Sequence, residues 1–157
     1  MAVRQWSKEE NVSFYTEYAE QVKATLDQIS WTKLQSVVNS LYVAWLNGRQ
    51  VFVMGNGGSA ATASHMACDL GKNTAIAGQP RLRVMSLNDN MALFSAHGND
   101  NGYENVFAEQ LLTFVKPDDV VIAISASGNS PNVLNAVRLA KTQSALTIGW
   151  SGYEGGA

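Results

Sequence analysis

A short apolar segment that leads into a glycine-rich turn and then into a helix-forming segment constrains the fold most. The apolar segment spans residues 51–54, the turn is Gly55-Asn56-Gly57-Gly58, and the helical segment runs from Ser59 to Leu70. Glycine lets the backbone approach a ligand closely, and the first N–H groups of a helix lack partners within the helix. The sequence therefore predicts a strand, a loop and a helix whose amino end binds an anion, with phosphate as the expected ligand.

Strand-forming and helix-forming segments alternate along the rest of the chain. Strands are expected at residues 82–87, 120–125 and 145–150, and helices at residues 89–96, 103–114 and 131–141. Short, almost continuous apolar strands that alternate with helices indicate a parallel sheet covered by helices on both faces. We therefore predict an α/β fold, in which ligands bind beyond the carboxyl ends of the strands.

Two amphipathic helices are predicted before the first strand. Ser7 and Glu10 have the spacing of a capping box, and a second periodic segment at residues 31–46 ends before Asn47-Gly48, which favours helix termination. The apolar residues at helical spacing after the capping box are Val12, Tyr15, Ala19, Val22 and Leu26. The length of 157 residues suits one domain, with a helical segment at residues 1–48 and an α/β core at residues 49–157.

Charge and cysteine content argue against several classes of protein. A net charge of -2 with 15% charged residues supplies no broad basic surface, so nucleic acid is not an expected ligand. Cys68 is the only cysteine, which excludes an internal disulfide, and its expected role is that of a small buried apolar group. Neither a signal peptide nor an apolar run of membrane-spanning length is recognisable. A cytoplasmic protein without a membrane partner is expected.

A second loop, rich in hydroxyl groups, follows the strand expected at residues 120–125. It reads Ser125-Ala126-Ser127-Gly128-Asn129-Ser130 and is followed by Pro131. Ser130 suits the N-cap of a helix and Pro131 its first position, so the N–H groups of that turn should face the loop. A well-capped helix would explain these two residues alone. The further hydroxyls, at the same edge of the sheet as Ser59, favour a second anion-binding loop.

Asn99 and Asp100 are expected in a third polar loop, residues 97–102. Two interpretations stay open for this loop. Its asparagine and aspartate side chains suit hydrogen bonds to sugar hydroxyls, but Asn, Asp and Gly are also the usual composition of a turn. The nearby His97 has no neighbour at ligand spacing.

His65 and Asp69 are four residues apart, so both should project from one helix face, about one turn beyond the anion site. Together they supply two of the three or four ligands that zinc requires. The alternative is a hydrogen-bonded pair that stabilises its own helix.

Three other ligand-binding or catalytic motifs are not completed by the residues present. Gly55-Asn56-Gly57-Gly58-Ser59-Ala60 fits the dinucleotide pattern, but the acidic residue expected about 20 positions later is missing. A Walker loop requires Gly-Lys-Ser/Thr, and no lysine lies between Arg49 and Lys72. Gly128-Asn129-Ser130 lacks the second glycine of a nucleophile elbow.

The motifs resemble those of the sugar isomerase (SIS) domain family, and within it those of the phosphoheptose isomerases. The resemblance extends from the amino-terminal helices to the end of the chain. The segments that carry it are Gly55-Asn56-Gly57-Gly58-Ser59, His65 with Asp69, Gly98-Asn99-Asp100, Ser125-Ala126-Ser127-Gly128-Asn129-Ser130 and residues 147–156. It implies a single SIS domain.

The resemblance implies a sugar phosphate as ligand. The residues implied to bind the phosphate are Ser59, Ser125, Ser127 and Ser130, and those implied to line the sugar are Asn56, Gly57, Gly58, Asn99 and Asp100. Ala126 stands where the family commonly has a threonine, so one hydroxyl is lost while the backbone N–H remains.

The resemblance also implies zinc as a cofactor, with His65 and Asp69 as metal ligands and catalytic residues. In the family a glutamate occupies the second position and moves a proton between the first two sugar carbons through an enediol. Asp69 is one methylene shorter, and a displacement of about an ångström costs up to roughly 100-fold in rate when nothing compensates for it.

The end of the chain differs from the family. The family continues beyond Gly155-Gly156 with a helix, a strand and a final helix that supplies a glutamine and a histidine as the remaining zinc ligands. This chain stops at Ala157. We expect it to be an incomplete version of a longer protein rather than a shortened, inactive member, and we expect the sheet to have an uncovered edge.

The implied function of the complete protein is the interconversion of D-sedoheptulose 7-phosphate and D-glycero-D-manno-heptose 7-phosphate, for surface-glycan or lipopolysaccharide synthesis, by a homotetramer. The alternative is a non-catalytic protein, either a phosphosugar-binding module or a scaffold that associates with the replication initiator. Asp69 in place of glutamate favours the alternative, whereas the pairing of His65 with an acid four residues later favours the enzyme.

Overall fold

The computed structural model describes residues 8–157, with side chains from Val12 onward. The contact predicted between Ser7 and Glu10 lies outside the described residues. The chain divides into two compact units, residues 1–36 and 37–157. The boundary expected near residue 48 stays a prediction.

The first unit consists of helix α1 (Lys8–Asp27) and the start of helix α2 (Trp31–Leu46). The two helices predicted before the first strand are therefore confirmed. Every described side chain of α1 is exposed, including the apolar ones predicted to lie at helical spacing. The rings of Phe14 and Tyr18 stack with their centroids 6.4 Å apart. This helix thus presents aromatic and aliphatic side chains on its surface.

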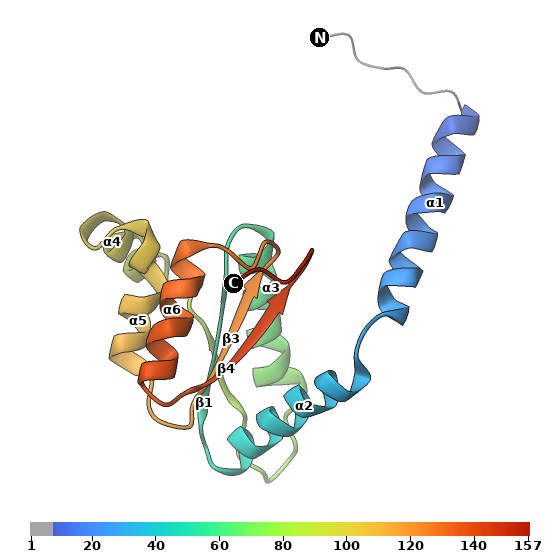
Figure 1. Ribbon diagram of the computed structural model, residues 1–157. Coiled ribbons are helices and arrows are strands. Elements are labelled where there is room, and N and C mark those ends of the chain that lie inside the picture. The colour runs from blue at the N-terminus through green and yellow to red at the C-terminus, as the bar shows by residue number, and fades with distance from the viewer. Residues whose placement is uncertain (1–7) are drawn as a thin grey trace. The chain divides into compact units, whose positions relative to one another are not determined.

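The second unit is built on a parallel sheet, as the alternating pattern predicts. Its strands are β1 (Gln50–Gly55), β2 (Arg83–Ser86), β3 (Val120–Ser125) and β4 (Leu146–Ser151), in the spatial order β2-β1-β3-β4 (Figure 1). Val51 of β1 lies opposite Val84 of β2 on one side and Val120 of β3 on the other. All carboxyl ends consequently meet at one edge of the sheet.

Helices cover both faces of this sheet, which confirms the predicted α/β architecture. Val51 and Val53 pack with Ala44 of α2 and Ala63 of α3 (Gly58–Cys68). The alternate residue Phe52 packs on the other face, which is covered by helices α4 (Met91–Asp100), α5 (Val106–Phe114) and α6 (Pro131–Thr142). Side chains of a strand alternate between the two faces, so the apolar run of β1 supplies both halves of the core.

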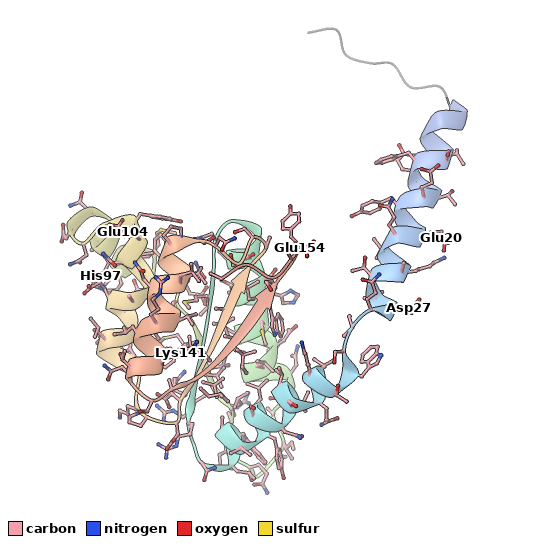
Figure 2. The ribbon with its side chains drawn as sticks, viewed as in Figure 1. Glu20, Asp27, His97, Glu104, Lys141 and Glu154 are labelled. Carbon is pink, nitrogen blue, oxygen red and sulfur yellow. The ribbon has the colours of Figure 1, made fainter. Side chains whose placement is uncertain are left out.

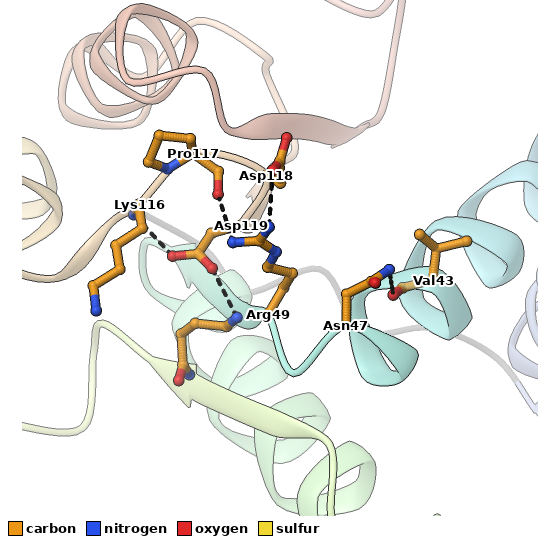
Figure 3. A network of polar contacts seen from close by, with 8 residues as sticks. Val43, Asn47, Arg49, Lys116, Pro117, Asp118 and Asp119 are labelled. Atoms are coloured by element: carbon orange, nitrogen blue, oxygen red, sulfur yellow. Dashed lines mark hydrogen bonds and ion pairs between the residues drawn. The ribbon is translucent and has the colours of Figure 1, made fainter.

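A network of carboxylate and backbone groups joins β1 to β3 at the amino edge of the sheet (Figure 3). The buried Asp119 carboxylate accepts hydrogen bonds from the Gln50 N–H and the Lys116 N–H, both at 2.8 Å. Arg49 Nη2 contacts Asp118 Oδ2 at 3.0 Å. These contacts fix the starting points of the two central strands, and therefore the position of their carboxyl ends.

The structure corrects the prediction for Cys68, whose side chain is exposed rather than buried. Ala63 and Ala67 are the residues of α3 that face the sheet, and Cys68 follows about 100° further around the helix. No helix in residues 8–157 is both long and apolar enough to cross a membrane.

Candidate functional site

The loops that follow β1 and β3 lie side by side at the carboxyl edge of the sheet. From β1 the chain passes through α3 to β2 on one side, whereas β3 lies on the other side of β1. This arrangement makes the gap between β1 and β3 the topological switch point of the sheet, which is where α/β proteins bind ligands. The two loops predicted to bind an anion are the two that flank it.

The glycine loop, which we define as residues 55–59, is shaped by its backbone. Gly57 has φ 55° and ψ -121°, a conformation that side chains other than glycine's disfavour. A Cβ on Gly55 would lie 2.8 Å from the Ile124 carbonyl oxygen, so this loop packs directly against the end of β3. Glycine is required at both positions, for the turn and for the close approach.

Two N–H groups expected to be free for an anion already have partners in this loop. The Ser59 N–H donates to the Asn56 carbonyl at 2.9 Å, and the Ala60 N–H donates to the Gly57 carbonyl at 3.0 Å. The helix begins at Gly58, one residue before the predicted start, and Gly57 is its N-cap. The tight turn therefore uses donors that the sequence pattern assigned to the ligand. The Ser59 hydroxyl remains as the predicted side-chain donor.

Asn88, at the end of β2, holds the glycine loop from the other side. Its Nδ2 donates to the Gly55 carbonyl at 2.9 Å, and its Oδ1 accepts from the Gly55 N–H at 3.2 Å. Asn88 was not predicted as part of the site. The available signal was a polar residue directly after an apolar strand, at the edge where ligands are expected.

The serine loop, which we define as residues 125–130, brings its hydroxyl groups together. The Oγ atoms of Ser125 and Ser130 lie 3.2 Å apart, and Ser127 Oγ accepts a hydrogen bond from the Asn129 N–H at 3.2 Å. A hydroxyl that accepts from an N–H keeps its own proton to donate. Ser125 is buried while Ser127 is exposed, so the loop places donors at its surface.

Helix α6 begins as predicted, with Ser130 at the N-cap and Pro131 at the first position. The Ser130 hydroxyl nevertheless contacts Ser125 and makes no capping hydrogen bond. The Val133 N–H is bound by Asn132 Oδ1 at 3.0 Å, and Pro131 has no N–H to offer. The first turn of α6 consequently offers fewer free N–H groups than predicted, and the hydroxyls carry more of the donor capacity.

The turn after β4 covers one side of the serine loop. The Gly152 N–H donates to the Ala126 carbonyl at 3.0 Å. Gly128 has φ 66°, and a Cβ there would lie 2.1 Å from the Gly155 carbonyl oxygen. In Figure 2, Glu154 lies on this turn beyond the end of β4, and Lys141 lies at the carboxyl end of α6, away from the serine loop.

Asn56 and Asn132 join the two loops through a reciprocal pair of side-chain amides. Asn56 Nδ2 donates to Asn132 Oδ1 at 2.8 Å, and Asn132 Nδ2 donates to Asn56 Oδ1 at 2.9 Å. The Tyr103 hydroxyl donates to the same Asn56 oxygen at 3.0 Å. The Asn56 side chain, predicted to line the sugar, is thus hydrogen-bonded within the protein. Its partner Asn132 was not predicted as part of the site.

His65 of α3 and Asp69, the first residue of the π-helical turn η1 (Asp69–Asn73) that continues α3, lie together on one face, as their spacing predicts. His65 Nε2 is 3.3 Å from Asp69 Oδ2, and Asp69 Oδ1 accepts from Asn73 Nδ2 at 2.8 Å. The side chains are 78% and 51% exposed, and they line a surface pocket together with Thr62 and Met66. Solvent therefore reaches both groups.

Their distance from the glycine loop is larger than predicted. His65 follows Ser59 by six residues and Asp69 by ten, which at about 1.5 Å per residue puts them roughly 9 and 15 Å along the helix. This is about two to three turns rather than one. Any ligand that contacts both the loops and Asp69 must be elongated.

Asn99 and Asp100 lie in the last turn of α4 and not in a loop, which corrects the prediction. Asn90 Oδ1 caps the start of this helix by accepting from the Leu93 N–H, and the helix continues through Gly98 to Asp100. The Asn99 and Asp100 side chains hydrogen-bond to each other at 2.7 Å. Among the described residues, neither forms a hydrogen bond to the glycine loop or to the serine loop.

The fold and these loops define an α/β protein in which hydroxyl and amide side chains gather at the switch point of the sheet. The SIS domain family matches residues 17–152. The phosphoheptose isomerase of Solidesulfovibrio magneticus is 37% identical over 142 residues, which cover 90% of this chain and 63% of that protein. The lincomycin biosynthesis protein LmbN of Streptomyces lincolnensis is 41% identical over 74% of this chain and 45% of that protein.

A solved structure of a phosphoheptose isomerase from Francisella tularensis superposes with a TM-score of 0.87 at 28% identity, over 97% of this chain and 79% of that one. The chain belongs to the SIS domain family. It spans less than two thirds of the length of the Solidesulfovibrio magneticus isomerase and of LmbN.

Proposed function

We propose that this chain is the sugar-phosphate-binding part of a phosphoheptose isomerase, which interconverts D-sedoheptulose 7-phosphate and D-glycero-D-manno-heptose 7-phosphate. The observation that carries the proposal is the adjacency of the glycine loop and the serine loop at the switch point of the sheet. The similarity to phosphoheptose isomerases in sequence and in structure supports this substrate.

The phosphate is proposed to bind between the two loops. Ser127 and Ser130 would donate their hydroxyl protons to it, together with Ser59 and the backbone N–H of Ala126. Hydrogen bonds from preorganised neutral donors to a charged oxygen are shorter and stronger than those between neutral groups. Because the phosphate is remote from the reacting carbons, its binding energy orients the first two carbons of the sugar for proton transfer.

Asp69 is the proposed base. An aldose-ketose isomerisation moves one proton between the first two carbons through an enediol, and a carboxylate can remove and return that proton. His65 and Asn73 contact the two Asp69 carboxylate oxygens, which would hold the carboxylate in one orientation. An open-chain sugar phosphate is elongated, as the separation between the loops and Asp69 requires. Asn99 and Asp100 stay proposed contacts to the sugar.

Zinc is the proposed cofactor, with His65 and Asp69 as two of its ligands. A zinc site takes at least three protein ligands. Residues 8–157 contain no group of three or more His, Cys, Asp or Glu side chains placed to hold a metal ion. The residues present do not complete such a site, so we assign no reaction step to the metal.

A homotetramer in the cytoplasm is the proposed state of the protein. The exposed apolar and aromatic side chains of α1 offer a surface for self-association. The exposed thiol of Cys68 suits a reducing compartment. The non-catalytic alternative, a phosphosugar-binding module or a scaffold for the replication initiator, is not favoured, because phosphoheptose isomerases are among the relatives in both sequence and structure.

The test of the proposed reaction is an isomerase assay with Asp69 variants of the complete protein, since residues 8–157 do not complete the proposed zinc site and this chain alone is expected to be a poor catalyst. Asp69→Asn keeps the shape of the side chain but removes the basic lone pair, so turnover should fall by about 100-fold or more. Asp118→Asn, which changes an exposed carboxylate at the amino edge, is the matched control and should leave turnover unchanged.

Exchange of the C2 proton of the aldose, D-glycero-D-manno-heptose 7-phosphate, with solvent deuterium follows the proton transfer itself. Exchange that continues at the wild-type rate in Asp69→Asn would show that another group is the base. Asp69→Glu restores the methylene of the family's glutamate, and it should preserve or raise turnover if the shorter side chain is a drifted version of that base.

A further inference from the structure

We propose that Asn132 is a positioning residue for phosphate binding: through Asn56 it fixes the spacing between the glycine loop and the serine loop. The inference rests on the proposed phosphate site and assigns a role within it to a side chain that is 2% exposed and that need not touch the ligand. Asn132 is the second residue of α6, immediately after Ser130 and Pro131, so its backbone continues the serine loop.

The orientation of the amide pair follows from a fixed donor. The Val133 N–H can only donate, so the Asn132 atom that it contacts at 3.0 Å must be the carbonyl oxygen Oδ1. Asn132 Nδ2 is then the donor to Asn56 Oδ1, and Asn56 Nδ2 the donor back to Asn132 Oδ1. Two antiparallel hydrogen bonds between planar amides define both the distance and the relative orientation of their backbones.

The pair is tied to two further elements. Tyr103 adds a second donor to Asn56 Oδ1, and Asn88 holds Gly55, the residue before Asn56, from the β2 side. Asn56 is thus anchored from α6, from the turn before α5 and, through Gly55, from β2. No buried side-chain polar atom of the described residues is left without a partner, so the network is fully satisfied. A fully satisfied buried network rigidifies the elements that it joins.

The consequence for binding is geometric. Phosphate hydrogen bonds have narrow distance limits, so donors on two separate loops act together only if the loops keep their spacing. Removing either amide of the pair frees the glycine loop from α6 without removing a hydroxyl donor. Affinity for phosphate should therefore fall although every Ser donor remains in place.

Asn135 provides a matched control on the same helix. It lies one turn after Asn132, is partly buried where Asn132 is fully buried, and its Nδ2 donates to the Glu104 carbonyl at 3.0 Å. It joins α6 to the turn before α5 but contacts neither loop. Asn135→Ala should lower stability through lost hydrogen bonds, as Asn132→Ala does, without altering the spacing of the loops.

The experiment is an NMR titration of the full chain with inorganic phosphate, a probe that lacks the sugar and so reports no direct contact of Asn56 with sugar hydroxyls. Asn132→Ala and Asn56→Ala should each raise the Kd by about tenfold, the lower end of what the loss of a supporting outer contact costs. The variant that carries both substitutions should bind phosphate no more weakly than the single variant with the lower affinity, because each substitution removes the same shared interaction. Asn135→Ala should stay within about twofold of wild type.

Asn56→Ala keeps the test decisive if the buried Asn132→Ala chain does not fold, because Asn56 is only partly buried. Wild-type affinity in Asn132→Ala or in Asn56→Ala would overturn the proposal. A loss in Asn135→Ala as large as in Asn132→Ala would also overturn it, since the effect would then be general loosening of α6.

The outcome separates this proposal from the proposed reaction. If the wild-type chain binds phosphate and the amide variants weaken it, but no isomerisation is found, the reaction is wrong and the positioning role stands. If isomerisation is found, Asn132→Ala should raise KM for D-sedoheptulose 7-phosphate more than it lowers kcat, because the phosphate is held in both ground and transition states. A wild-type chain that does not bind phosphate would overturn both the positioning role and the phosphate site.

Discussion

The strand ends are held together by charged side chains at the amino edge of the sheet and by neutral side chains at the carboxyl edge. At the amino edge, the charged side chains of Asp119, Arg49 and Asp118 bind backbone groups and one another. At the carboxyl edge, neutral amides and hydroxyls join the ends of β1, β2 and β3. A carboxylate is a strong acceptor but would repel a phosphate, whereas amides and hydroxyls can hold the backbone and still leave donors for an anion. The difference separates the edge that fixes the strands from the edge suited to an anionic ligand.

The largest effect should come from Asp119 at the amino edge. Asp119→Ala leaves the Gln50 and Lys116 N–H groups, whose hydrogen bonds are part-buried, without their acceptor, and a donor left unsatisfied on burial costs roughly 1–3 kcal/mol. The free energy of unfolding, measured in urea, should fall by about 3 kcal/mol. Asp119→Asn keeps one acceptor oxygen and should lose less. Phosphate affinity should be unchanged in both folded variants, and a large loss of affinity would break the distinction between the edges.

A smaller effect, on phosphate affinity rather than on stability, is expected from Ser127 at the carboxyl edge. Ser127→Ala removes one charge-assisted hydrogen bond to phosphate, so affinity should fall by about tenfold, which is roughly 1.4 kcal/mol. Unfolding in urea should change little because Ser127 is exposed. The control is Ser95→Ala, an exposed serine whose hydroxyl bonds only to the Ala92 carbonyl of its own helix. Equal affinities of wild type and Ser127→Ala would remove the serine loop from the site.

The smallest effect should come from Arg49. Its ion pair with Asp118 is solvent-accessible, the two side chains being 39% and 71% exposed. Exposed ion pairs contribute about 0–1 kcal/mol. Arg49→Ala should accordingly lower stability by about 0.5 kcal/mol, and the effect should shrink at high salt. A loss as large as that of Asp119→Ala would show that the network acts as one unit rather than through the buried carboxylate.

The sequence predicts the sheet well because its signals are local. The apolar runs and the strand-to-helix alternation are properties of neighbouring residues, and β3 begins and ends at the predicted residues 120 and 125. The serine loop and the pairing of His65 with Asp69 are local for the same reason. The helix expected at residues 89–96 continues to Asp100, and its end was placed too early because Gly98 lies inside the helix and the glycine that follows it is Gly102.

The contacts between the loops could not be predicted because they are not local. Asn56 and Asn132 are 76 residues apart in the chain, and Gly55 and Asn88 are 33 apart. Asparagine after a strand or at a helix start also has an ordinary local role, so its type alone does not indicate a partner. Only the strand order β2-β1-β3-β4 brings these amides to one place.

The central claim is that the carboxyl edge, between the glycine loop and the serine loop, binds the phosphate of a sugar phosphate. Calorimetric titration of the full chain with D-sedoheptulose 7-phosphate and with unphosphorylated D-sedoheptulose tests it most directly. We expect the phosphorylated sugar to bind at least about 100-fold more tightly, because its phosphate accepts two or more charge-assisted hydrogen bonds. Most of this difference should disappear in the Ser127→Ala, Ser130→Ala double variant. Equal affinity for the two sugars would contradict it.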